Sequence, residues 1–292
     1  MAKSREIKGR MKAVGNIQRI TRTMQMIATS KFSKAQQAAL ASKPYTEGLF
    51  DLVAQLSDAA EGVDHPLLGS AETGAAKELT LLISSERGLC GPYNANIIRT
   101  GLHHFRDSEA ARTGEVQLVG KKGLAALSFA GIEVAEQHAV GDQPKYQDVE
   151  RIAQTYIDRF SAGELSAVRV IYMRYISAGR QTPEVLQLLP FSREAAAGPA
   201  SETEASSAVY EFTPDAAELI GELLPAAVKA TLFQAFNDAV VSEHVARMVA
   251  MKAASDNASK LGKTLKRKYN RARQAQITTE LTEIISGAAA LG

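Results

Sequence analysis

The chain has 292 residues, of which 45% are hydrophobic, 23% are charged and only 6% are aromatic. Its 34 basic and 32 acidic side chains give a net charge of +2, which excludes a uniformly polybasic or polyacidic protein. The single cysteine excludes an internal disulfide framework and a four-cysteine zinc site. No stretch reaches the roughly 20 consecutive apolar residues of a membrane-spanning helix. The N-terminus also lacks the apolar run of a secretory signal, so we expect a soluble chain that begins at its mature start.

The first segment of the chain predicts one long helix. Apolar and small residues recur every 3.5 residues on average, which is the spacing of a coiled-coil seam. These residues are Ile7, Met11, Val14, Ile17, Thr21, Met24, Ala28, Phe32 and Ala35. No proline precedes Pro44, so about 40 residues at 1.5 Å each predict a rod of roughly 60 Å. We assign residues 1–60 to this helix.

The middle of the chain alternates short apolar runs with helical patterns. The predicted strands are Leu79–Ser85, Val116–Val119, Ile132–Ala135, Val168–Ile176 and Glu184–Leu189. Helices are predicted from Asn94, from Lys121 and over Tyr146–Phe160. This alternation predicts a mostly parallel sheet covered by helices, so we assign residues 77–194 to an α/β domain. Linkers rich in small residues flank it at Ala59–Ala76 and Ala195–Ala208.

The last segment, residues 209–292, predicts a second long helix. Thr213 and Pro214 suit an N-cap and a first turn, and a kink is expected at Pro225. Roughly 60 residues from Ala226 to Ser286 would span about 90 Å. The predicted seam consists of Ala246, Val249, Ala250, Ala253, Ala254, Ala258, Leu261 and Leu265. Neither long helix can bury its seam alone, so we expect the two to pack on each other, antiparallel or with the middle returning the chain to the same end.

A search for catalytic chemistry yields no active site. Gly262-Lys263-Thr264 ends like a phosphate-binding loop, but Asn257 stands where that loop needs glycine, and the stretch lies in a predicted helix. Arg87–Gly91 lies between a strand and a helix, where phosphates often bind, yet a tight turn is the favoured interpretation. Cys90 is interpreted as a small buried thiol rather than a nucleophile. The five histidines have no metal-ligand spacing, so we predict no cofactor and no metal.

The two ends of the chain are strongly basic. Nine basic residues and one acid, Glu6, lie between Lys3 and Lys34, and seven basic residues with no acid lie between Lys260 and Arg273. Three interpretations stay open at this point: solvated helix faces, a partner with acidic surfaces, or nucleic acid. Stacking aromatic residues would favour nucleic acid, but each basic cluster contains only one aromatic residue.

Several runs resemble the gamma subunit of rotary F-type ATP synthases. They are Ile7–Met11 with Ile20–Ala28, Ala246–Met251 with Asp256–Ala258, and Tyr269–Leu281 with Glu283-Ile284 and Ser286–Ala288. Ser85–Gly91 is similar to the SDRGLCG turn of that family, with Glu86 in place of its aspartate. Pro92 and Tyr93 stand where the family usually has a small or glycine pair. Arg267 and Lys268 stand at positions that are often apolar in the family.

The resemblance implies an antiparallel coiled coil of the terminal helices with a Rossmann-like α/β foot domain. It implies a noncatalytic rotor subunit, present once per complex, that couples ion flow to ATP synthesis or hydrolysis. The implied partners are the alpha and beta subunits, whose lever loops are acidic in this family, together with epsilon and the ring of c subunits. The implied location is the cytoplasmic face of the bacterial plasma membrane, peripheral to it, with no nucleic acid bound.

The resemblance also implies roles for single residues. Met24 and Arg247 match positions implicated in coupling, and Arg273, Gln274 and Thr278 match positions that touch the beta subunits. The residues Arg87, Gly88, Leu89, Cys90 and Gly91 match the turn of the foot domain. The apolar end from Ile284 to Gly292 is expected in a sleeve formed by alpha and beta. The alternatives are a coiled-coil nucleic-acid or ribosome-associated factor and a nucleotide-using enzyme built on the α/β domain.

Overall fold

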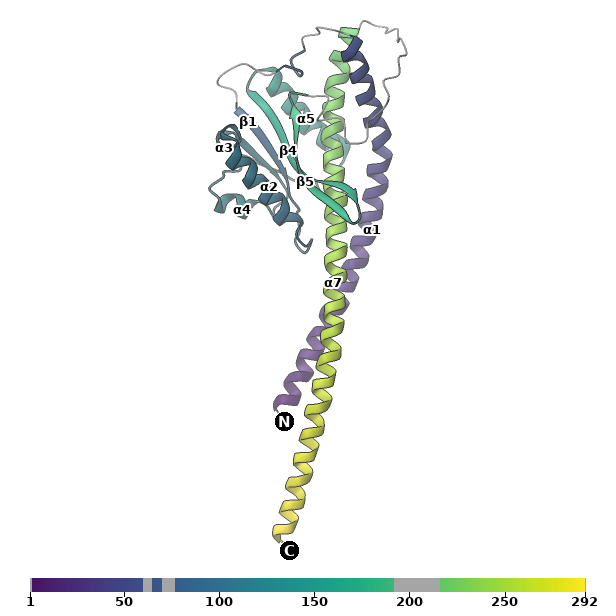
Figure 1. Cartoon of the computed structure of the whole chain (residues 1–292), viewed down its shortest axis with the longest axis vertical. Helices are drawn as coiled ribbons and strands as arrows, with labels where there is room; N and C mark the ends of the chain where they lie inside the picture. Colours follow the sequence, from purple (N-terminus) through teal and green to yellow (C-terminus); the bar gives the residue numbers. More distant parts are fainter. Residues whose placement is uncertain (1, 60–64, 70–76, 192–215, 292) are drawn as a thin grey trace. The chain divides into compact units, whose positions relative to one another are not determined.

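A computed structural model describes residues 2–59, 65–69, 77–191 and 216–291. The chain begins and ends with a long helix, α1 (Ala2–Ala59) and α7 (Ala216–Leu291), and the strands of a sheet domain lie between them in the sequence (Figure 1). The chain divides into two compact units, and both long helices contribute to each of them. The coil unit comprises residues 1–30 and 247–292, and the sheet unit comprises residues 31–246.

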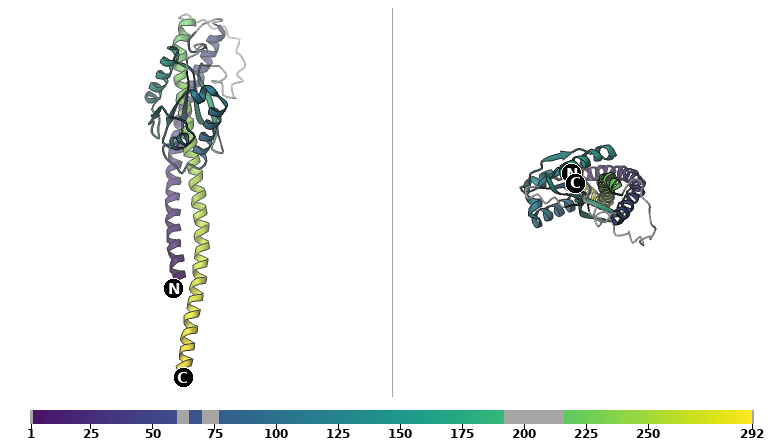
Figure 2. Two further views of the ribbon diagram at one scale, coloured as in Figure 1. Left: turned by 90° about the vertical axis from the view of Figure 1, so that its left-hand side faces the viewer. Right: turned by 90° about the horizontal axis from the view of Figure 1, so that it is seen from above.

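Within the coil unit, α1 and α7 lie side by side and run antiparallel (Figures 1 and 2). The Oγ of Ser4 donates a hydrogen bond to Oε1 of Gln276 at 3.0 Å. Further along, a Cβ added at Gly262 would lie 3.9 Å from a methyl carbon of Val14. The least exposed residues of α7 here follow alternating steps of four and three residues, and they are Met251, Ser255, Ala258, Gly262, Leu265, Tyr269, Ala272 and Gln276. This spacing confirms the predicted coiled coil.

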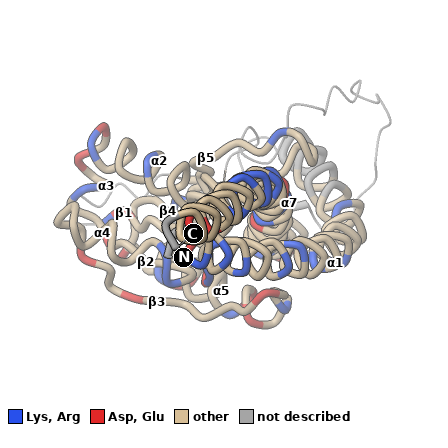
Figure 3. The backbone as a smooth tube through the Cα atoms, turned by 90° about the horizontal axis from the view of Figure 1, so that it is seen from below, with Lys and Arg blue, Asp and Glu red and all other residues tan. Residues whose placement is uncertain are grey.

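The prediction of the seam is wrong at four residues, which are exposed in the structure. Ile17 is 52% exposed, and Gln18 takes the less exposed position instead. On α7, Val249, Ala253 and Leu261 are also exposed. The prediction followed hydrophobicity, whereas the real seam follows the alternation of three- and four-residue steps and includes polar and very small side chains. Apolar side chains therefore lie outside the seam, and Figure 3 shows Lys and Arg distributed along the same two helices.

The sheet has five strands in the order β3-β2-β1-β4-β5. Their bounds are β1 Lys77–Ile83, β2 Glu115–Val119, β3 Glu136–His138, β4 Leu165–Ser177 and β5 Arg180–Leu189. The strands β3, β2, β1 and β4 pair in parallel, and β5 returns antiparallel to β4 as a hairpin. The predicted mostly parallel sheet is confirmed. One strand is misplaced: Ile132–Ala135 is irregular, and Ile132 and Val134 pack against the core while the next residues form β3.

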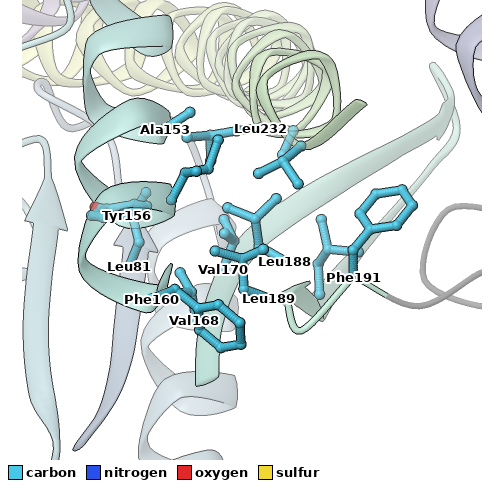
Figure 4. Close-up of a cluster of buried hydrophobic side chains, with 14 of the residues drawn as sticks. Leu81, Ala153, Tyr156, Phe160, Val168, Val170, Leu188, Leu189, Phe191 and Leu232 are labelled. Atoms are coloured by element: carbon cyan, nitrogen blue, oxygen red, sulfur yellow. The ribbon is translucent and has the colours of Figure 1, made fainter. Parts of the chain in front are cut away.

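Helices cover both faces of this sheet. They are α2 (Tyr93–Asp107), α3 (Glu109–Thr113), α4 (Leu124–Phe129) and α5 (Tyr146–Ser161), and α3 was not predicted. Alternate residues of the central strand β1 face opposite ways, because side chains of a strand alternate. Leu81 joins a core with α5 and α7, whereas Leu82 joins a second core with α2, α3 and α4. Figure 4 shows the first core, in which Leu232 of α7 faces strand and α5 side chains.

Neither long helix stops at its internal proline. α1 continues through Pro44 to Ala59, and α7 runs through Pro225. By length and composition alone α7 contains a stretch apolar enough to cross a bilayer, but half of that stretch is buried within the protein, which is the pattern of a core helix. Thr213, Pro214, the linker Ala195–Ala208 and most of Ala59–Ala76 lie outside the described residues.

Candidate functional site

The turn after β1 is held by a buried polar network. Asn94, in the first turn of α2, accepts the backbone N–H of Ser85 at 3.0 Å through Oδ1 and donates from Nδ2 to Oγ of Ser85 at 2.7 Å. The same Nδ2 lies 3.2 Å from Sγ of Cys90. Cys90 is buried, so the interpretation as a small buried thiol is confirmed.

This network presents Arg87 and Leu89 on the surface. Leu89 is 61% exposed and has a φ of 63°, a left-handed conformation that costs a leucine roughly 1–2 kcal/mol. Gly91, with a φ of 57°, adopts the same region without a side-chain penalty. Pro92 then precedes α2, and the ring of Tyr93 is buried in the second core. The five turn residues Arg87–Gly91 therefore form a hydrogen-bonded strand-to-helix turn.

The carboxyl ends of β1 and β2, where open α/β sheets usually bind ligands, are covered by α7. Phe236, Ala239, Val240, Glu243 and His244 of this helix line the space above Ser84 and Gly120. The remaining cavity measures about 40 Å³, whereas small-molecule pockets usually measure about 300–1,000 Å³. This cavity does not accommodate a nucleotide. Gly262-Lys263-Thr264 lies inside α7, so its backbone cannot form a phosphate-binding loop, as the sequence indicated.

The surface of the coil unit carries a large positive charge. Its residues include 16 Lys and Arg but only four Asp and Glu, which gives a net charge of +12 within a chain of +2. Figure 3, viewed from below, shows the Lys and Arg residues along both helices. Such a field attracts acidic surfaces and weakens as salt screens it.

The same surface exposes many large apolar side chains. They are Ile17, Ile20, Met26, Ile27, Val249, Leu261, Ile277, Leu281, Ile284 and Ile285. Apolar residues scattered singly are normal on a protein surface, but ten large ones exposed on two helices make the coil unit the candidate contact surface for partners. The sequence predicted the charge of these ends, but it missed most of these apolar side chains because they were attributed to the seam or left unassigned.

The structure does not bring all five predicted contact residues together. Arg273, Gln274 and Thr278 are exposed within one stretch of α7, where Oγ1 of Thr278 donates to the carbonyl oxygen of Gln274 at 3.0 Å. Arg247 lies 26 residues earlier on the same helix, or about 39 Å away at 1.5 Å per residue. Met24 on α1 and Arg247 are both half-buried. Arg247 therefore lies well apart from Arg273, Gln274 and Thr278 along α7.

Comparison with known proteins identifies the family. The family model described as ATP synthase matches residues 3–291. A protein of Rhodopirellula baltica named ATP synthase gamma chain is 40% identical over 295 residues, covering 100% of this chain and 99% of its own length. The protein of the same name from Leptothrix cholodnii is 38% identical over the full length of both chains.

The chain belongs to the ATP synthase gamma chain family. Solved structures agree with this fold. A chain in the Euglena gracilis mitochondrial ATP synthase, solved as OSCP, F1 and c-ring, matches 99% of this chain with a TM-score of 0.67 at 18% identity. A chain in the central stalk and c-ring of Tetrahymena thermophila ATP synthase matches 81% of it with a TM-score of 0.58. The expected gamma-chain fold, two long helices around an α/β sheet domain, is therefore confirmed.

Proposed function

We propose that this gamma chain is the central-stalk rotor of an F-type ATP synthase. In this role it couples ion flow through a membrane ring to ATP synthesis or hydrolysis at beta subunits by rotation, and it carries no catalytic group itself. The full-length match to gamma chains is the observation that carries the proposal.

The surface of the coil unit supports this role physically. Its exposed apolar side chains give contacts without preferred direction, and its +12 charge attracts acidic partners. Individual exposed ion pairs contribute only about 0–1 kcal/mol. Contacts of this kind suit a part that must bind and release three equivalent partners in turn, because no single contact holds it at one angle.

We assign roles to segments and residues accordingly. Residues 1–60 and 209–292 form the shaft, and residues 77–194 form the foot domain. Arg273, Gln274 and Thr278 contact beta subunits, and Met24 and Arg247 contribute to coupling. The exposed turn Arg87–Gly91 belongs to the foot.

The proposed partners are alpha and beta subunits around the coil unit, with epsilon and the c-subunit ring at the foot. One copy is present per complex. The complex would lie on the cytoplasmic face of the bacterial plasma membrane, with this chain peripheral to the bilayer.

Rotation provides the decisive experiment. The chain is assembled with the alpha and beta subunits of its own source, the ring is fixed to a surface, and a bead is attached to the foot. Because Cys90 is buried, a Glu109→Cys substitution supplies the accessible thiol, since the Glu109 side chain is 82% exposed. ATP should drive rotation of the bead in one direction. A stable ring that hydrolyses ATP while the bead stays fixed would contradict the rotor assignment.

A further inference from the structure

The two long helices are attached to the sheet domain in different ways. Most residues of α7 from 231 to 245 are buried, and Leu232 and Phe236 belong to the first core. On α1, residues 31–38 are all half-buried or exposed. Burial therefore anchors α7, whereas this stretch of α1 depends on individual contacts.

Two contacts join this stretch of α1 to the sheet domain. Lys31 forms an ion pair with Asp142, which lies in the loop between β3 and α5. Phe32 packs against the ring of Tyr175, near the end of β4, with ring centroids 6.2 Å apart and planes inclined at 58°. Nε2 of Gln36 donates a hydrogen bond to the Tyr175 hydroxyl at 3.5 Å.

The two contacts hold α1 on different sides. Successive residues of an α-helix are turned by about 100°, so Phe32 and Gln36, which both meet Tyr175, lie about 40° apart around the helix axis. Lys31 lies about 100° from Phe32 on the other side. A single contact would act as a pivot, whereas two contacts on different sides resist both rotation and sideways displacement of the helix.

The end of β4 also holds α7. Oγ of Ser242, which is fully buried, donates a hydrogen bond to the carbonyl oxygen of Met173 at 3.2 Å. Met173 precedes Tyr175 by two residues on the same strand. On α1 the sheet unit begins at Lys31, and on α7 it ends at Ala246, four residues after Ser242. Both helices are thus attached close to the point at which they leave the sheet unit.

We propose that the ion pair Lys31–Asp142 and the ring contact Phe32–Tyr175 form a clamp, the α1 clamp, that carries torque between the foot and α1. The proposal rests on the rotor function and assigns positioning residues for it. Without the clamp, torque from the foot would enter the shaft mainly through α7. The shaft would still turn, but it would twist further under the same torque, because one helix is softer in torsion than two.

Hydrogen exchange on the full chain, without partner subunits, tests the attachment. Lys31→Met combined with Tyr175→Leu removes the charge and the ring. After correction for intrinsic rates, exchange of amides 31–38 should become about tenfold faster, because local opening of this stretch then breaks fewer contacts. Amides 231–245 should keep the protection of wild type. Unchanged exchange at 31–38 overturns the clamp.

Two matched variants separate the clamp from general effects of substitution. Lys31→Arg combined with Tyr175→Phe keeps the charge and both rings, so its exchange should match that of wild type. Lys34 is exposed on the same stretch of α1, and Lys34→Met should also match wild type. A tenfold change in either variant would show that exchange here does not depend on the two contacts, and it would overturn the clamp.

A bead on the foot tests the transfer of torque. It is attached through the Glu109→Cys substitution in the assembled complex, and its angle is followed while rotation is stalled by withdrawing ATP. The thermal variance of this angle is inversely proportional to torsional stiffness. It should increase in Lys31→Met/Tyr175→Leu and keep the wild-type value in Lys31→Arg/Tyr175→Phe. A merely structural role would lower assembly yield without changing the variance.

The two experiments give separate results for the clamp and for the rotor. A wild-type bead that never rotates with ATP contradicts the rotor function, and the exchange measurement then decides the attachment alone. A rotating complex whose angular variance is the same in Lys31→Met/Tyr175→Leu as in wild type overturns the torque-carrying clamp and leaves the rotor function intact.

Discussion

Ser4, two residues after α1 begins, donates a hydrogen bond to Gln276, fifteen residues before α7 ends. Only Ala2 and Lys3 of the described α1 precede Ser4, whereas fifteen residues of α7 follow Gln276. The side chains of Ile277, Leu281, Ile284 and Ile285 are exposed as a result. The last four turns of α7 form a single helix whose apolar side chains are available to partner subunits.

The first prediction concerns this single-helix end. Replacing Ala288, Ala289 and Ala290 with glutamate should impair assembly or lower the ATPase rate, whereas truncation after Gly287 should be tolerated better. Apolar contacts have no preferred direction and allow sliding, while buried charges must be paired or desolvated at a cost. Assembly yield and ATPase rate are measured for both variants side by side. If the glutamate variant behaves like wild type and the truncation fails, the end makes specific contacts instead.

The second prediction concerns contact with beta. Arg273→Ala combined with Gln274→Ala should lower ATP turnover in the assembled complex without changing nucleotide binding to beta. Hydrogen bonds involving a charged group contribute about 1.5–3 kcal/mol, so the decrease in ATP turnover should be large. Arg271→Ala, an exposed basic residue of the same helix, serves as the matched control. Undiminished turnover in the double variant would remove these residues from the contact.

The third prediction concerns Met24, which is half-buried on α1. In Met24→Lys the complex should assemble and hydrolyse ATP, but ion pumping per ATP should fall because a charge enters a packed contact. Thr29 is exposed on the same helix, so Thr29→Lys gives the control and should pump normally. Pumping is followed with a pH-sensitive dye in inverted vesicles while hydrolysis is measured in parallel. Equal coupling in both variants would mean that Met24 faces only solvent.

The fourth prediction concerns stability of the sheet unit. Gly120 and Gly131 both have left-handed φ values, 78° and 76°. A Cβ at Gly120 would lie 2.5 Å from the carbonyl oxygen of Ser84, whereas a Cβ at Gly131 meets nothing within 4 Å. Gly131→Ala should lose about 1–2 kcal/mol of stability from its conformation alone. Gly120→Ala should lose clearly more, because backbone must also move.

Urea unfolding of the two glycine variants checks this difference. The midpoint of Gly120→Ala should lie well below that of Gly131→Ala, and both should lie below wild type. Equal midpoints would mean that the loop between β2 and α4 relaxes at little cost.

The sequence predicted the long helices better than the residues that join them. A 3.5-residue repeat identified a coil, and Met11, Val14 and Ala258 do lie in the seam. Ile17 does not, because the alternating steps pass through Gln18. Hydrophobicity alone cannot separate a seam residue from an apolar residue that faces a different partner, since both kinds occur on these helices.

The positions of strands could be predicted from the sequence where side chains on both faces of the strand are buried. β1 is buried on both faces and its apolar run was recognised, whereas β3 consists of Glu136, Gln137 and His138 and carries no strand-like pattern. It forms because β2 offers an open edge. In the candidate site, the turn Arg87–Gly91 was visible from its glycines. The contact of Tyr175 with Phe32 and Gln36 was not, because it joins segments far apart in the sequence.

The segment of α7 above the carboxyl ends of β1 and β2 occupies the space in which related sheet architectures receive a diffusible molecule. Phe236 and His244 fill this space as part of the same chain. Its occupancy therefore does not depend on the concentration of any ligand in the cell. The sheet therefore has no empty state and no loaded state to alternate between. A sheet architecture that elsewhere binds and releases a ligand is here kept filled by its own helix, so it serves as a fixed support for α7.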